Sequence, residues 1–93
     1  MLKQLYVKDL LDERKTPPEG ETVELLGWIK LRRDHGGKVF LYITDSTGTI
    51  QTICSSDTLS TDVLKTAKST PLESAVRIGG RVTTFGDERE IIV

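Results

Sequence analysis

The segment GWIKLRRDHGGKVFLYITD, residues 27–45, holds two strand-like runs joined by a loop of charged residues and glycines. The first run begins at Thr22, and its residues alternate between two faces with Gly27 inside the pattern. The second run, residues 38–44, alternates in the same way. A period of two is the spacing of a β-strand, and the glycines of DHGG suit a turn because glycine adopts positive φ without steric cost. We predict an antiparallel hairpin, with a bend or bulge at Gly27.

The flanking sequence predicts two helices and three more strands. Residues 2–14 have apolar positions close to a helical spacing, and the following KTPPEG cannot continue a helix. After the turn DSTG, the segment TIQTIC reads as a third strand. Residues 59–70 return to helical spacing, with Ser60 or Thr61 as the cap and Pro71 at the end. The expected apolar face of this helix consists of Leu59, Val63, Leu64 and Ala67. ESAVRIGGRVTTF and REIIV then read as the last two strands.

The order strand, strand, strand, helix, strand, strand is that of the OB fold, whose second and third strands form a ligand face for single-stranded nucleic acid. We therefore predict an all-β domain with one inter-strand helix, a five-stranded OB-fold barrel with a short N-terminal helix. The 93 residues form a single domain, with the N-terminal helix and loop in residues 1–20 and the barrel in residues 21–93. A chain of this length has room for a binding surface rather than a deep catalytic cleft.

Two aromatic residues of the second strand are placed unusually. If Val39, Leu41 and Ile43 face the barrel interior, Phe40 and Tyr42 face outward, beside the basic loop. Exposed aromatic rings next to cations are what stacking of unpaired bases requires. An alternative is that the N-terminal helix covers Phe40. For Trp28 we favour a structural position under that helix over a stacking role.

The charges are balanced overall but unevenly distributed. The net charge of −1 argues against binding of nucleic acid by bulk electrostatics alone. A local basic patch nevertheless lies within nine positions, and its only acidic neighbour there is Asp34. The patch consists of Lys30, Arg32, Arg33, His35 and Lys38. On charge alone, a solvated hairpin end is the alternative interpretation.

Several classes of function lack support in the sequence. Cys54 is the single cysteine, so it forms no internal disulfide and supplies no thiolate cluster, and we expect it to be a small buried residue. Neither a membrane span nor a secretion signal is evident, so we expect a cytoplasmic protein. Phosphate-binding loops, paired His/Cys residues and metal-ligand patterns are absent too. We predict no catalytic residue, no metal and no cofactor.

The segment GWIKLRRDHGGKVFLYITDSTGTIQ resembles the N-terminal anticodon-binding domain of the class II aminoacyl-tRNA synthetases for aspartate, asparagine and lysine. The shared pattern is a Gly-Trp strand, an Arg-Arg-Asp turn, a Phe in the second strand, Asp-x-x-Gly, and a Gln in the third strand. The resemblance implies that Phe40 stacks on the middle anticodon base, a uridine, that Gln51 hydrogen-bonds its edge, and that Arg33 contacts the anticodon stem-loop. A glutamine amide also suits that edge on chemical grounds, because it offers a donor and an acceptor together.

The chain departs from the family pattern in two places. The loop TTFGDERE is shorter than in many members, where it helps to read the first and third anticodon bases, and the chain stops at Val93, before a class II catalytic domain. RRDHGG is similar to the aspartate members, whereas KVFLYITDSTGTIQ is similar to archaeal asparagine members.

We therefore expect a tRNA-binding domain that acts in protein biosynthesis by recognition, without chemistry of its own. The expected nucleic-acid-binding residues are Arg33, Phe40, Gln51, Arg32, Lys30, Tyr42, His35 and Lys38. The partner is the anticodon stem-loop of a tRNA. A class II catalytic domain, in cis or in trans, and a second copy in a homodimer are further partners that stay open. Two alternative functions are a general single-strand binder and a protein-interaction OB module that docks a partner.

Overall fold

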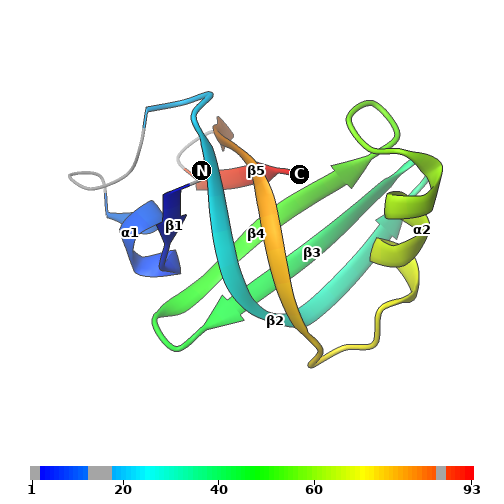
Figure 1. The fold of residues 1–93 in the computed structure, drawn as a ribbon, viewed down its shortest axis with the longest axis horizontal. Coiled ribbons are helices and arrows are strands. Elements are labelled where there is room, and N and C mark those ends of the chain that lie inside the picture. The colour runs from blue at the N-terminus through cyan, green and yellow to red at the C-terminus, as the bar shows by residue number, and fades with distance from the viewer. Residues whose placement is uncertain (1–2, 13–17, 86–87) are drawn as a thin grey trace.

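Three antiparallel strands form the centre of the sheet in the computed structural model, which describes residues 3–12, 18–85 and 88–93. They are β2 (Thr22–His35), β3 (Lys38–Asp45) and β4 (Gly48–Ser55). Figure 1 shows them as one curved meander. His35 pairs with Lys38, so two glycines make the turn between β2 and β3, and Gly36 has a φ of 60°. The predicted hairpin and its glycine turn are confirmed.

Two further strands close the sheet into a ring. β5 (Ala75–Phe85) and β6 (Glu88–Ile92) pair antiparallel with each other. β5 also pairs with the first half of β2, and β6 pairs in parallel with β4. The five strands β2 to β6, with α2 (Thr61–Ser69) between β4 and β5, have the order predicted for an OB fold.

The interior of the ring holds the alternate apolar residues of these strands. Val39, Leu41 and Ile43 of β3 are buried, whereas Phe40 and Tyr42 on the opposite face are partly exposed. Cys54 is also buried, as expected, and burial raises the pKa of its thiol to about 11. The alternation in the sequence therefore predicted correctly which residues of these strands face the interior.

The N-terminal segment differs from the single helix predicted over residues 2–14. Residues Lys3–Leu5 form a short strand, β1, which pairs in parallel with β2. Tyr6 is extended, and only Val7–Leu11 form a helix, α1, which ends at the extended residue Asp12. The remaining part of the predicted helix lies outside the described residues. Apolar spacing alone could not reveal β1, because its formation depends on the free edge that the start of β2 offers.

The irregularity in β2 lies at Lys30 and not at Gly27. The pairing of β2 with β3 shifts between Ile29 and Leu31, which leaves Lys30 without a partner. Gly27 has another reason to be glycine. A Cβ atom there would lie 2.5 Å from the backbone oxygen of Thr44, so a side chain would force β2 and β3 apart. The prediction of a bulge at Gly27 is wrong, and the glycine permits close strand packing instead.

Helix α2 covers one end of the ring without burying any residue fully. Ser60 is its N-cap, as predicted, and accepts a hydrogen bond from the backbone N–H of Val63 at 3.3 Å. Leu64 and Ala67 pack against the core, but Val63 is 49% exposed and does not belong to the packed face. Within the described residues, neither helix has the length and apolar character that a bilayer span requires.

Asp45 fastens the N-terminal segment to the turn between β3 and β4. Its carboxylate accepts hydrogen bonds from the backbone N–H groups of Val7 at 2.8 Å, Thr47 at 2.7 Å and Gly48 at 3.2 Å, and from the Thr47 hydroxyl. Partial burial acts to raise the pKa of Asp45, but these hydrogen bonds outweigh it and hold the pKa below its usual value. One carboxylate therefore stabilises both the start of α1 and the turn.

We expect Asp45→Ala to lower the free energy of unfolding by about 1 to 2 kcal/mol at neutral pH, because α1 and the turn lose their shared acceptor. A carboxylate whose pKa is depressed by folding stabilises the fold above its unfolded-state pKa, and this contribution is lost as the pH falls through the folded-state pKa. The difference between wild type and variant should therefore shrink below about pH 4. Urea unfolding at several pH values measures this difference in the free energy of unfolding. The control is Asp57→Ala, which changes an exposed aspartate in another turn. A pH-independent difference would contradict this role.

Candidate nucleic-acid interface

One open pocket of about 310 Å³ lies on the outer face of β2, β3 and β4, at the end near the β2–β3 turn. It gathers six of the eight residues that the sequence singled out. They are Arg33, His35, Lys38, Phe40, Tyr42 and Gln51. The pocket thus combines two aromatic rings, an amide and cationic side chains on one surface.

Strand pairing explains why these residues meet. Arg33 is directly opposite Phe40 across the β2–β3 pair, and Tyr42 is directly opposite Gln51 across the β3–β4 pair. The bulge at Lys30 matters here, because it moves Leu31 and Arg33 onto the outer face beside Tyr42 and Phe40. Side chains directly opposite one another on one face of an antiparallel pair are close neighbours. A regular β2 would have turned Arg33 away from this face.

Two ring contacts join side chains of β2 to the aromatic residues of β3. The His35 ring meets Phe40 nearly edge-on, with centroids 5.8 Å apart and an interplanar angle of 73°. The guanidinium carbon of Arg33 lies 5.8 Å from the centroid of the Tyr42 ring, within the range of a cation–π interaction. Each of the two rings thus has one neighbouring side chain from β2: His35 lies beside Phe40, and Arg33 lies over Tyr42.

The N-terminal helix does not cover Phe40. α1 lies at the other end of β3 and β4, where Val7 is near Gly48 and is tied to Asp45. Figure 1 shows α1 and the β2–β3 hairpin at opposite ends of the molecule. The alternative of a covered Phe40 is therefore wrong, and the half-exposed ring is available to a ligand.

The amide of Gln51 is held by a residue that sequence reasoning missed. Its Nε2 donates a hydrogen bond to Oε2 of Glu90, which is 5% exposed and is paired with Gln51 across β4 and β6. A carboxylate only accepts hydrogen bonds, so it fixes which side of the amide carries the nitrogen. The local sequence gives no means to distinguish Glu90 from the exposed Glu88, because the contact depends on the parallel β4–β6 pairing.

Two of the predicted basic residues lie outside this pocket. The Arg32 guanidinium donates hydrogen bonds to the backbone oxygens of Ala67, at 3.0 Å, and Thr70, at the C-terminal end of α2. A cation at this position satisfies carbonyl groups that the helix itself leaves free. Lys30 is exposed at the bulge and is not part of the pocket wall. Arg32 thus has a structural role. The cluster of basic residues in the sequence could not show that Arg32 contacts α2 rather than nucleic acid.

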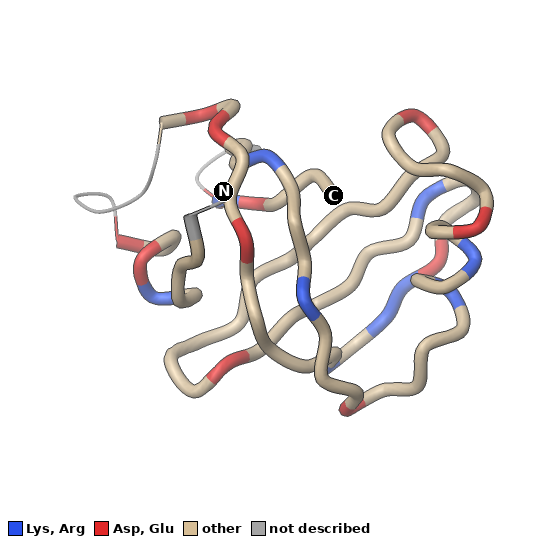
Figure 2. Tube along the Cα trace, in the orientation of Figure 1, with Lys and Arg blue, Asp and Glu red and all other residues tan. Residues whose placement is uncertain are grey.

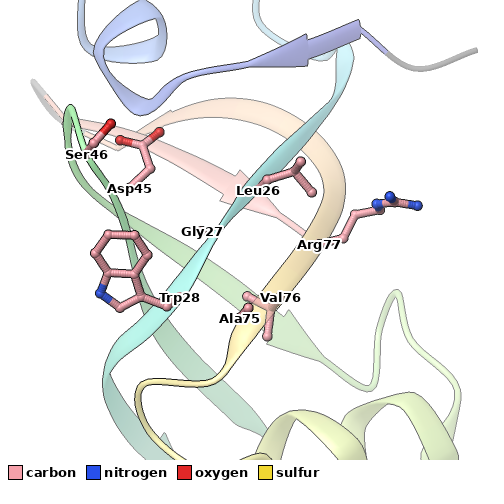
Figure 3. Close-up of a pocket in the computed structure, with 8 residues that line it drawn as sticks. All are labelled: Leu26, Gly27, Trp28, Asp45, Ser46, Ala75, Val76 and Arg77. Atoms are coloured by element: carbon pink, nitrogen blue, oxygen red, sulfur yellow. The ribbon is translucent and has the colours of Figure 1, made fainter.

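Trp28 is not buried beneath the N-terminal helix either. Its side chain is 36% exposed on the outer face of β2, opposite Thr44. It lines a second groove, which Figure 3 shows with Leu26 and the Asp45–Ser46 turn. The preference for a covered Trp28 is therefore wrong.

The basic residues of β2 and β3 lie together at one end of the molecule, as the sequence suggested. Figure 2 shows the blue segments of β2 and β3 close to α2, at the hairpin end, whereas the N-terminal segment is mostly tan with both red and blue positions. Arg33, His35 and Lys38 are exposed there. The positive charge is thus concentrated beside the pocket that contains Phe40.

Comparison with known proteins decides the family. Residues 22–93 match the tRNA anticodon family model, which is described as an OB-fold nucleic acid binding domain. The chain belongs to this family. The match covers β2 to β6, and therefore every strand that lines the two outer-face grooves.

Individual relatives of this OB-fold domain are tRNA ligases. The chain is 38% identical over 89 residues to an asparagine–tRNA ligase of Pyrococcus abyssi, covering 96% of this chain and 19% of the relative. It is 41% identical over 69 residues to an aspartate–tRNA(Asp/Asn) ligase of Methanoculleus marisnigri, covering 74% of this chain and 16% of the relative. The domain thus spans about a fifth or less of the length of these relatives.

A solved structure agrees with the sequence matches. Asparaginyl-tRNA synthetase from Pyrococcus horikoshii superposes with a TM-score of 0.79 at 27% identity, covering 99% of this chain and 22% of that one. The chain is an OB-fold domain of the anticodon-binding type that resembles the N-terminal domain of asparaginyl- and aspartyl-tRNA synthetases. The resemblance predicted from GWIKLRRDHGGKVFLYITDSTGTIQ is confirmed at this level.

Proposed function

We propose that this domain binds the anticodon loop of a tRNA, with the central anticodon base stacked on Phe40. The observation that carries the proposal is the single pocket in which Phe40, Gln51 and Arg33 meet. An unpaired base on an aromatic ring gains about 1 to 3 kcal/mol, and the hydrogen-bonding edge of that base then lies free to be read. Gln51 is on the neighbouring strand, within the same pocket wall.

The Gln51–Glu90 hydrogen bond supports a preference for uridine. A free glutamine amide could pair with uridine, and after rotation by half a turn with cytidine, because these two bases exchange donor and acceptor positions on this edge. Rotation would place the amide oxygen of Gln51 against the Glu90 carboxylate, so the buried glutamate opposes it. The amide keeps one N–H and its oxygen for the base. Glu90 is thus a positioning residue.

The basic side chains around Phe40 bind the backbone of the loop. His35 and Lys38 flank the turn and are exposed, and Arg33 is oriented by the ring of Tyr42. Arginine and lysine on this rim are suited to phosphate oxygens, which position RNA without reading its sequence. Lys30 supplies a further exposed cation on β2.

The relatives suggest the setting of this activity. Because their names denote asparagine and aspartate ligases, we infer that the domain holds the tRNA by its anticodon while the acceptor end of the tRNA reaches a class II catalytic domain, in cis or in trans, in the cytoplasm. The ligation reaction belongs to that catalytic domain. A homodimer would place two such surfaces in one particle.

A general single-strand binder is the competing function, and one titration separates the two. We expect the domain to bind an anticodon stem-loop hairpin at least about tenfold more tightly than a linear RNA of the same loop sequence, because the hairpin presents the splayed bases in fixed geometry. Fluorescence anisotropy with both RNAs at one salt concentration measures the ratio. Equal affinities would favour the general binder instead.

A further inference from the structure

A second groove, of about 640 Å³, lies on the outer face of β2 beyond the Phe40 pocket. Its walls are largely apolar and include Leu26 and Trp28, which are 38% and 36% exposed. In Figure 3 the indole of Trp28 extends toward the turn that carries Asp45 and Ser46. Neighbouring apolar side chains that are exposed together along a groove mark an interaction surface, which a single exposed residue does not.

A row of outward-facing residues on β2 and β3 runs from the Phe40 pocket to this groove, although the two share no lining residue. Along the outer face, the opposed pairs run in sequence from Arg33 and Phe40, through Leu31 and Tyr42, to Trp28 and Thr44. Phe40 and Thr44 are four residues apart on β3, which corresponds to about 13 Å along the strand. Leu31 is 40% exposed between the two sites. One extended strand of RNA could therefore lie across both aromatic positions.

The two acidic residues beside the groove both have partners, so they repel RNA less than their charges alone suggest. The Asp45 carboxylate is already engaged by the N–H groups of Val7, Thr47 and Gly48. Glu24 lies on the other side, 3.6 Å from the Arg77 guanidinium. Lys30 is exposed at the bulge between Trp28 and Leu31, where it can meet a phosphate of a strand that crosses the face.

We propose that Trp28 is a second stacking platform, which takes an unpaired base of the RNA whose central anticodon base is held at Phe40. The inference rests on the proposed function, since it requires RNA at Phe40. It adds a nucleobase site at the groove of Leu26 and Trp28 and extends the RNA footprint along β2 and β3. A sequence-tolerant contact is expected, because every base has a π face and no amide or carboxylate is free there to read an edge.

The protein itself supplies the probe, because Trp28 is the only tryptophan in the chain. Titration with an anticodon stem-loop hairpin should quench Trp28 emission, with the same midpoint as anisotropy of the labelled hairpin. Trp28→Ala should weaken hairpin binding by about 5- to 20-fold, or about 1 to 2 kcal/mol, and Trp28→Phe should restore most of it. Leu72→Ala, at another exposed apolar residue, is the control and should bind as wild type does.

The outcomes separate this inference from the proposed function. If the hairpin binds, but Trp28 emission does not change and folded Trp28→Ala binds equally well, the groove takes no base while anticodon binding stands. If emission responds instead to an added class II catalytic domain and not to RNA, the groove is a protein-docking site and the inference is wrong. If wild type binds no hairpin, both fail. Circular dichroism establishes that each variant is folded.

Discussion

Phe40→Ala is expected to weaken binding of an anticodon hairpin by about 1 to 3 kcal/mol and to leave the salt dependence of binding nearly unchanged. The ring is partly exposed, and within the described residues its aromatic contact is with His35. The substitution therefore mainly removes a stacking surface for the base. No counterion is released by stacking, and the slope of log affinity against log salt should therefore stay the same. Anisotropy titrations at several salt concentrations measure both quantities.

Arg33→Ala provides the matched comparison from the same pocket. If Arg33 contacts a phosphate, its removal should weaken binding to all hairpins alike and flatten the salt slope by up to about one unit. A loss that depends on hairpin sequence would instead assign Arg33 to a base edge. If folded Phe40→Ala binds as tightly as wild type, the ring is not a base platform, and docking of a protein on this face becomes the better explanation.

Glu90→Gln is expected to reduce the preference for a central uridine over a central cytidine from about 5- to 150-fold to near unity. The substitution is nearly isosteric, so the barrel should stay intact. A glutamine at this position can donate as well as accept, and it no longer opposes rotation of the Gln51 amide. The affinity for the uridine hairpin itself should change much less than the ratio.

Gln51→Ala is the companion variant to Glu90→Gln. It should also remove the preference, but with lower affinity for the uridine hairpin, because the base loses its hydrogen-bonding partner. A ratio that stays at the wild-type value in Glu90→Gln would show that the glutamate does not position Gln51. A urea titration of each variant distinguishes loss of recognition from loss of folding.

The alternation within residues 27–45 was enough to predict the central hairpin and its two faces. Val39, Leu41 and Ile43 are buried, and Phe40 and Tyr42 are outside, because a strand offers only two faces and the core selects the aliphatic one. The helix capped by Ser60 was predictable for a similar local reason. These features depend on spacing within one segment.

Features that depend on pairing between distant segments were not predictable in this way. β1 exists because β2 offers a free edge, and the bulge at Lys30 sets which basic residues face the pocket. Arg32 and Arg33 are adjacent and chemically identical, yet one binds the end of α2 and the other lies over Tyr42. Glu90 escaped notice, and the exposure of Trp28 was not foreseen, because their neighbours lie on other strands.

The most direct test of anticodon recognition is a titration of the wild-type domain with two hairpins that differ only at the central anticodon base. The Phe40 platform and the fixed Gln51 amide predict that the uridine hairpin binds more tightly than the cytidine hairpin by about 1 to 3 kcal/mol, or about 5- to 150-fold. Both titrations are made at the same salt concentration, so that phosphate contacts cancel. Equal affinities for the two hairpins would contradict the account.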